Sequence, residues 1–104
     1  MRSNIYETSE AYLIEMEVPG VKKEDIKIST LNSNTLVIEV SGDKRDRDVL
    51  EWFCRGFLDD HNGRFVFDIP SDVDKDAISA KEELGILVVT LKKKEDSKKI
   101  IEVE

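Results

Sequence analysis

The stretch Ala80-Lys-Glu-Glu-Leu-Gly-Ile-Leu-Val-Val-Thr-Leu91 decides how the rest of the chain must fold. At the two-residue period of a β-strand, one face carries Ile86 and Val88, and the other carries Leu87, Val89 and Leu91. Strands that are apolar on both faces usually lie inside a sheet or are covered by a partner. Gly85 follows a polar turn, where a positive φ or a close backbone approach is cheap only for glycine. We therefore expect a central strand with other strands packed around it.

Short alternating segments precede this strand at intervals of about 8–12 residues. Their boundaries carry Pro, Gly, Asn and Asp, which favour turns. The segments expected to be strands are residues 4–7, 11–18, 26–31, 36–40, 63–69, 77–81 and 85–91. Residues 71–76 are expected to form a turn or one helical turn. This rhythm, with no long helical period, indicates an all-β sandwich.

Length and composition limit the classes of protein. The chain has 104 residues, which is the size of one domain, and a net charge of −7, which argues against nucleic-acid binding. Five lysines lie close together near the C-terminal end: Lys92, Lys93, Lys94, Lys98 and Lys99. We interpret this basic segment as a solvated tether rather than a phosphate-binding site, because no aromatic residues lie between the lysines. No segment is typical of a signal peptide or a membrane span. We expect a cytoplasmic protein.

No group of residues carries catalysis. Cys54 is the only cysteine, which excludes an internal disulfide and a multi-cysteine metal site and fits a reducing compartment. His61 is the only histidine, and its acidic neighbours match no calcium-loop spacing, so a turn is the better interpretation. Cys54 and His61 could be interpreted as a nucleophile and its base. We favour the alternative, in which Cys54 is a small apolar-like residue beside aromatic residues. We expect no enzymatic activity, no cofactor and no metal.

Residues 43–62 interrupt the strand rhythm. They begin with charges of alternating sign and continue with a cluster that includes Trp52, Phe53 and Phe57. A loop of this length in a compact domain usually has a function. The aromatic residues predict that the loop docks on another surface.

Several segments, in order, resemble one family. Ala80-x4-Gly85-x-Leu87 is similar to the signature that enters the last strand of the α-crystallin domain in small heat-shock proteins. Residues 11–26, 35–42 and 67–78 are similar to other parts of that domain, and the resemblance extends from about residue 4 to residue 103. The sequence departs from the family pattern at Leu84 and Lys92, where a polar residue and a proline are usual. In the family, a segment called the N-terminal arm precedes the domain, and we expect this chain to have almost none of it.

The resemblance implies an immunoglobulin-like β-sandwich of seven to nine strands with Greek-key connections. Residues 1–92 would form the α-crystallin domain, and residues 93–104 a C-terminal extension. The loop at 43–62 would carry a strand that swaps onto the first strand of a partner, with Trp52, Phe53 and Phe57 as anchors. In the alternative, these aromatic residues fold back onto their own domain.

The tail Ile100-Ile-Glu-Val103 resembles the C-terminal element of the family, with Ile101 and Val103 as two knobs on one face. The resemblance implies a receiving groove between the strands at 26–31 and 77–81, near Ile28, Ile78 and Ala80. Such a segment binds by adding to a strand edge. The alternatives are a frayed tail or a last edge strand of the same subunit.

The function implied by the resemblance is an ATP-independent holdase that binds partly unfolded proteins and prevents their aggregation. The expected partners are unfolding client proteins and a second copy in a homodimer, with larger homo-oligomers formed through the tail. Neither nucleic acid nor a membrane is an expected partner. The alternative is a co-chaperone or scaffold sandwich that binds one specific folded partner.

Overall fold

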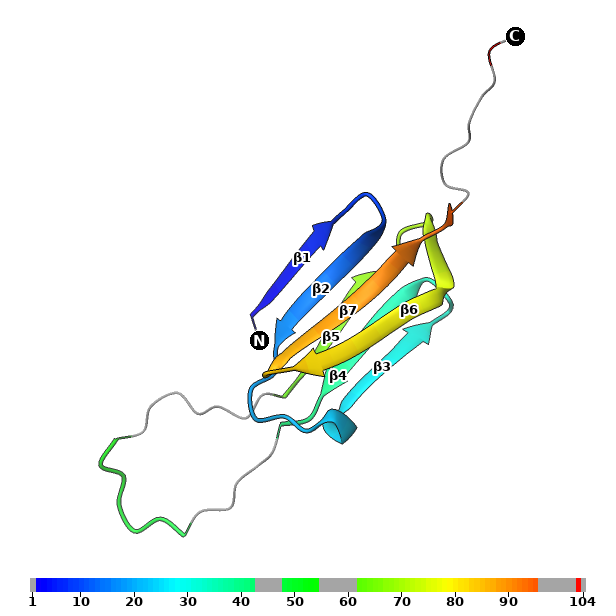
Figure 1. Cartoon of the computed structure of the whole chain (residues 1–104). Coiled ribbons are helices and arrows are strands. Elements are labelled where there is room, and N and C mark those ends of the chain that lie inside the picture. Colours follow the sequence, from blue (N-terminus) through cyan, green and yellow to red (C-terminus); the bar gives the residue numbers. More distant parts are fainter. Residues whose placement is uncertain (1, 43–47, 55–61, 96–102, 104) are drawn as a thin grey trace.

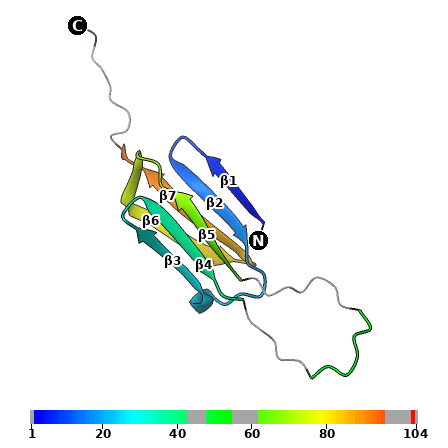
Figure 2. The same ribbon diagram turned by 180° about the vertical axis from the view of Figure 1, so that it is seen from behind.

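The computed structural model describes residues 2–42, 48–54, 62–95 and 103. Two antiparallel sheets face each other in a sandwich (Figures 1 and 2). One sheet has the order β1-β2-β7-β6, from β1 (Ser3–Glu7), β2 (Ala11–Glu17), β7 (Ile86–Lys93) and β6 (Val73–Glu83). The other has the order β3-β4-β5, from β3 (Ile26–Leu31), β4 (Thr35–Val40) and β5 (Gly63–Asp68). The described residues thus form seven strands, and the expected all-β sandwich is confirmed.

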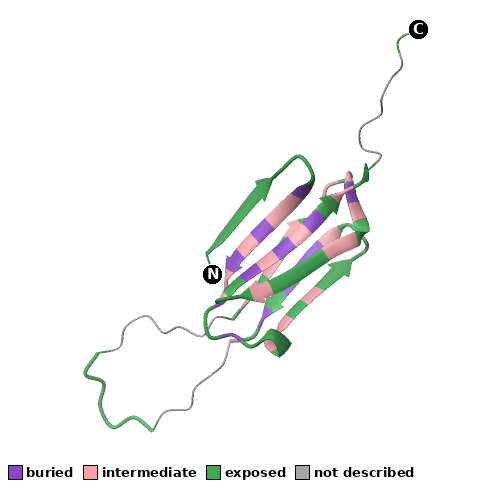
Figure 3. Cartoon of the chain, in the orientation of Figure 1, coloured by how far each residue is buried: buried purple, intermediate pink, exposed green. Residues whose placement is uncertain are grey.

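The core lies between the two sheets, and β7 is at its centre. The inward face of β7 is almost fully buried through Leu87, Val89 and Leu91, as its pattern predicted. Its outward face stays partly open, since Ile86 is 38% exposed. Across the core, Leu36 and Ile38 of β4 are also fully buried. Burial alternates along β7, and along β2 from Ile14 onward, because successive side chains of a strand point to opposite faces (Figure 3).

Two tight turns depend on positive φ. Asn32 and Ser33, in the three-residue connection from β3 to β4, have φ of 54° and 60°, and Leu84 and Gly85, which connect β6 to β7, have φ of 54° and 79°. The β6–β7 connection is a two-residue hairpin, in which positive φ at both positions matches the twist of the flanking strands. Gly85 therefore has the conformation that the sequence predicted. Leu84 is unusual because it adopts this conformation with a side chain that is 96% exposed.

Replacing Leu84 with asparagine is expected to stabilise the fold. Asparagine tolerates positive φ better than leucine, and no buried contact is lost, so the free energy of unfolding should rise by about 0.5–1 kcal/mol. Urea unfolding measures this change. Leu31→Asn is a matched control, because Leu31 is exposed but has no positive φ. Equal effects at the two positions would show that the turn conformation is not the cause.

The sequence prediction for β6 was wrong at its beginning. The strand starts at Val73 rather than residue 77, so only Ser71 and Asp72 form the turn. Val73 is fully buried and pairs with Lys93, and the register shifts between Val73 and Ile78. This buried anchor extends β6 through a run of acidic residues whose composition favours a turn.

A polar cluster fixes the end of the sheet from which the C-terminal segment leaves. The Tyr12 hydroxyl donates to Asp72 Oδ1 at 2.9 Å, and Lys93 Nζ donates to Glu7 and lies 5.0 Å from the centre of the Tyr12 ring. The hydrogen bond to Asp72 is the main cause that raises the pKa of Tyr12, and the bond to Glu7 is the main cause that raises the pKa of Lys93. Both groups therefore keep their protons at neutral pH, and the cluster holds β1, β2 and β7 together.

Candidate functional site: an apolar groove between two strand edges

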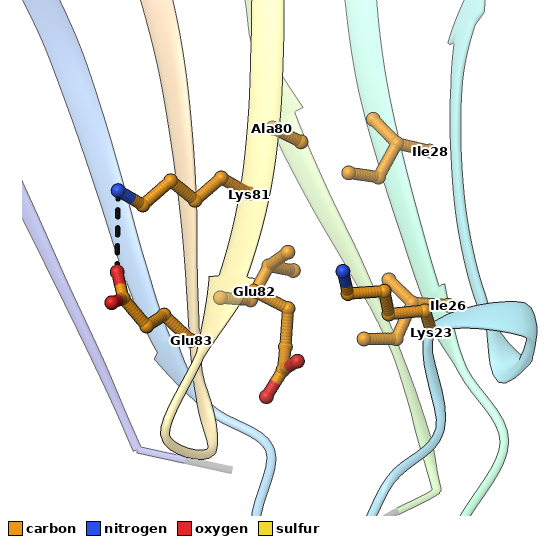
Figure 4. Close-up of a pocket in the computed structure, with 8 residues that line it drawn as sticks. Lys23, Ile26, Ile28, Ala80, Lys81, Glu82 and Glu83 are labelled. Atoms are coloured by element: carbon orange, nitrogen blue, oxygen red, sulfur yellow. Dashed lines mark ion pairs between the residues drawn. The ribbon is translucent and has the colours of Figure 1, made fainter.

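A groove of about 580 Å³ lies between β3 and β6, at the open side of the sandwich (Figure 4). It lies between two edge strands, because β3 and β6 are each last in their sheet. Its lining residues are Lys23, Ile26, Ile28, Ala80, Lys81, Glu82, Glu83 and Leu87. The backbone N–H and C=O groups along such edges are free to pair with an added strand.

Apolar side chains from both sheets make the inner surface of the groove. Ile26 and Ile28 project from β3 at a two-residue spacing, and Ala80 faces them from β6 (Figure 4). Leu87 of β7 also lines the groove and pairs in register with Glu82 of β6. An extended peptide with apolar residues at i and i+2 has the same spacing as the two isoleucines.

Charged side chains lie around these apolar residues, and those of β6 have defined partners. Lys81 Nζ forms an ion pair of 3.2 Å with Glu83, on the side of β6 away from β3 (Figure 4). Glu82 Oε1 accepts a hydrogen bond of 3.0 Å from the Gly85 N–H in the hairpin. Lys23 reaches toward β6 from the short helical turn η1 (Lys23–Asp25) and has no ion pair with any described residue.

The structure brings together only part of the residue set predicted for the groove. Ile28 and Ala80 line it, whereas Ile78 packs against the hydrophobic core and is not among the lining residues. Sequence reasoning missed Ile26 and Leu87 as lining residues. The signal for Ile26 was present, because it shares the face of Ile28 at a two-residue spacing.

A second open edge belongs to β1. Within the described residues β1 pairs only with β2, so its other edge is unpaired. All five residues of β1 are exposed, including Ile5 and Tyr6 (Figure 3). Long unpaired edges that carry apolar side chains are sites for pairing with another chain.

The described part of the long loop, residues 48–54, lies away from the sandwich (Figure 1). Its apolar residues are exposed: Leu50 and Phe53 almost completely, with Phe53 at 98%, and Trp52 at 48%. Cys54 is also exposed. Phe57, the third predicted anchor, and His61 lie outside the described residues.

The structure describes Val103, one of the two predicted knobs of the tail. Its side chain is 97% exposed, and residue 103 is not assigned to a strand. Ile101 lies outside the described residues. In the ranges that the structure describes, no group of three or more His, Cys, Asp or Glu side chains could hold a metal ion. Across the same ranges, no helix is long and apolar enough to cross a membrane.

Comparison with known proteins gives consistent results. The model of the Hsp20/alpha crystallin family matches residues 4–104. A 22.7 kDa class IV heat shock protein from Pisum sativum is 36% identical over 89 residues, covering 84% of this chain and 44% of that protein. A 16.9 kDa class I heat shock protein from Triticum aestivum is 33% identical over 94 residues, covering 88% of this chain and 61% of that protein.

A solved structure supports the fold. A small heat-shock protein from Xylella fastidiosa, reported to have a distinct high order structure, aligns with a TM-score of 0.79 and 22% identity. The alignment covers 99% of this chain and 94% of that one, and at this identity it shows the fold alone.

The two facing sheets and their order define an α-crystallin domain. The chain belongs to the Hsp20/alpha crystallin family, the small heat-shock proteins. It spans 61% of the length of the wheat relative and 44% of the pea relative.

Proposed function

We propose that this chain is an ATP-independent holdase that acts in the cytoplasm and binds partly unfolded proteins before they aggregate. The observation that carries this proposal is the groove between β3 and β6, where apolar side chains lie beside two unpaired strand edges. A destabilised client exposes extended apolar segments, and such segments fit an edge of this kind. The mechanism uses no catalytic residue.

Apolar burial supplies the binding free energy. Each Å² of apolar surface removed from water contributes roughly 25 cal/mol, and binding to the unfolded client competes with its self-association. The net charge of −7 supports the proposal because it helps to keep client complexes soluble. The apolar residues of segment 48–54 are a second candidate surface for clients.

The functional unit that we propose is a dimer. Segment 48–54 of each subunit would pair with the open edge of β1 in its partner, so that Trp52 and Phe53 become buried against that subunit. The exposure of Phe53 supports this arrangement over a loop folded back on its own domain, which would cover that ring. Reciprocal pairing about a two-fold axis removes two exposed edges at once.

Larger assemblies would form when the tail of one dimer enters the groove of another. The double variant Ile101→Ala/Val103→Ala should lose most species above the dimer, because both knobs are removed from one face of the tail. Size-exclusion chromatography with light scattering measures the mass distribution. Ile100→Ala is the matched control, since residue 100 points to the opposite face of an extended tail. Assemblies that persist in the double variant would show that the tail is not the linker.

Light scattering of a heat-stressed model client, without ATP and at equal molar subunits, tests the holdase activity. The proposal predicts suppressed scattering and soluble complexes of client and chaperone. The alternative, a co-chaperone or scaffold module for one folded partner, predicts unchanged scattering for general clients. A saturable complex with a single folded protein and no general suppression would replace the holdase proposal with that alternative.

A further inference from the structure

Lys93 joins the free edge of the larger sheet to the start of the C-terminal segment, residues 94–104. It is the last residue of β7, so the segment begins directly after it. Its ammonium donates a hydrogen bond to the carboxylate of Glu7, the last residue of β1. Because β2 lies between β1 and β7 in the sheet (Figure 1), the Lys93 side chain spans β2 to reach Glu7.

The surroundings of Lys93 hold its side chain in one position. Only 14% of the side chain is exposed, and Nζ lies 5.0 Å from the centre of the Tyr12 ring on β2. The Tyr12 ring is itself fixed, because its hydroxyl donates at 2.9 Å to Asp72 Oδ1. By contrast, the Arg2–Glu17 ion pair at the other end of β1 has side chains that are 87% and 42% exposed. Water and salt screen exposed ion pairs more, so Lys93 forms the stronger tie to β1.

Two backbone hydrogen bonds hold the start of the C-terminal segment. The Lys93 N–H donates at 2.8 Å to the carbonyl of Glu10, in the turn between β1 and β2. The Lys94 N–H donates at 2.7 Å to the carbonyl of Asp72, whose side chain also accepts the bond from the Tyr12 hydroxyl. The residues around the Lys93 side chain therefore also fix the backbone from which the segment leaves the sheet.

Order at the β1 edge and order at the start of the segment depend on each other through Lys93. Within the described residues β1 has β2 as its single neighbour, and all five of its residues are exposed. Strands of this kind open locally at a small cost in free energy. When β1 opens, Glu7 leaves Lys93, and one of the contacts that hold residues 93 and 94 is lost. A strand that pairs with β1 suppresses this opening and therefore also reduces the conformational freedom at the start of the segment.

We propose that Lys93 couples the β1 edge to the start of the C-terminal segment, so that a strand pairing with β1 also fixes where the segment leaves the sheet. Such coupling is reciprocal, so holding the segment should in turn strengthen pairing at β1. Lys93 is a positioning residue in this role, because it acts through Glu7 and through its own backbone. The inference rests on the proposed function only in naming a second copy as the source of the pairing strand.

Amide hydrogen–deuterium exchange of the full chain tests the coupling, with single residues resolved by mass spectrometry after electron-transfer fragmentation. Glu7→Gln removes a charge on β1 and leaves the backbone partners of residues 93 and 94 unchanged. Exchange at these two amides should nevertheless become about two- to fivefold faster, as expected for the loss of one partly exposed ion pair. Arg2→Gln is the matched control, because it breaks the exposed ion pair at the other end of β1, and it should leave exchange at residues 93 and 94 unchanged.

The reverse direction of the coupling is tested at Lys93 itself. Lys93→Met keeps an apolar side chain over the Tyr12 ring but removes the ammonium, so exchange along β1 should become faster by a similar factor. Lys93→Arg keeps the charge and should restore most of the protection. The variants are then compared at low and high protein concentration, because pairing between copies increases with concentration. Higher concentration should slow exchange at residues 93 and 94 in the unmodified protein but not in the Lys93→Met variant.

The outcomes separate this inference from the proposed dimer. Unchanged exchange at residues 93 and 94 in Glu7→Gln would overturn the coupling, even in a chain that dimerises. Equal acceleration in Arg2→Gln would also overturn it, because loosening of β1 would then reach the segment without Lys93. If Glu7→Gln accelerates exchange but concentration has no effect in the unmodified protein, the coupling stands, and a second copy is not the source of the strand that pairs with β1.

Discussion

Replacing Trp52 and Phe53 together with alanine is expected to convert the dimer into monomers. Fully buried aromatic residues at interface centres commonly contribute about 2 kcal/mol each, so the dissociation constant should rise by about 1,000-fold. Analytical ultracentrifugation at tens of micromolar subunits measures this change. The reason is structural: Phe53 is 98% exposed in the single chain, so its removal costs the monomer little.

A control variant separates this effect from general loss of surface hydrophobicity. Val66→Ala removes an apolar side chain that is 51% exposed on β5, in the other sheet, and should leave the dimer intact. An unchanged mass for the Trp52/Phe53 variant would show that segment 48–54 is not the interface. An unmodified protein that is already monomeric at this concentration would contradict the proposed strand exchange.

Replacing Leu91 with alanine is expected to cause a large loss of stability. Leu91 is fully buried and lies in register between Tyr12 of β2 and Ile78 of β6, so the truncation leaves a cavity inside the sandwich. Such substitutions cost about 2–5 kcal/mol, a large part of the 5–15 kcal/mol typical of a domain. Urea unfolding of the full chain measures this loss.

Thr90→Ala is the neighbouring control because residue 90 points to the outer face of the same strand. Its effect should stay within about 1 kcal/mol. Similar losses in the free energy of unfolding at the two positions would show that the inward face of β7 contributes no more to stability than its outer face.

The strands were predictable because apolar and polar residues alternate along each segment, and this alternation indicates which face is buried. The pattern of Ile86–Leu91 placed a strand inside a sheet, and β7 does pair with β2 and β6. Gly85 was predictable because a positive φ selects glycine. The start of β6 was not predictable, because Val73 stands alone among acidic residues and its burial depends on pairing with Lys93.

The groove was only partly predictable, because which strands form the edges depends on the order of strands in both sheets. Local alternation places Ile78 and Ala80 on one face of β6, but it does not show that Ile78 reaches the core while Ala80 faces the groove. The position of Lys23 depends on the helical turn before β3, which lies between two of the strands expected from the sequence. The arrangement of charged side chains around the groove therefore required the structure.

Site-specific photo-crosslinking tests most directly the claim that clients bind at the groove. A benzoylphenylalanine at position 80, in the groove, is compared with one at position 66, on the outer face of the other sheet. The account predicts adducts with a heated client from position 80, none from position 66, and none with the same client kept folded. Adducts that are absent at position 80, or equally abundant at position 66, would contradict it.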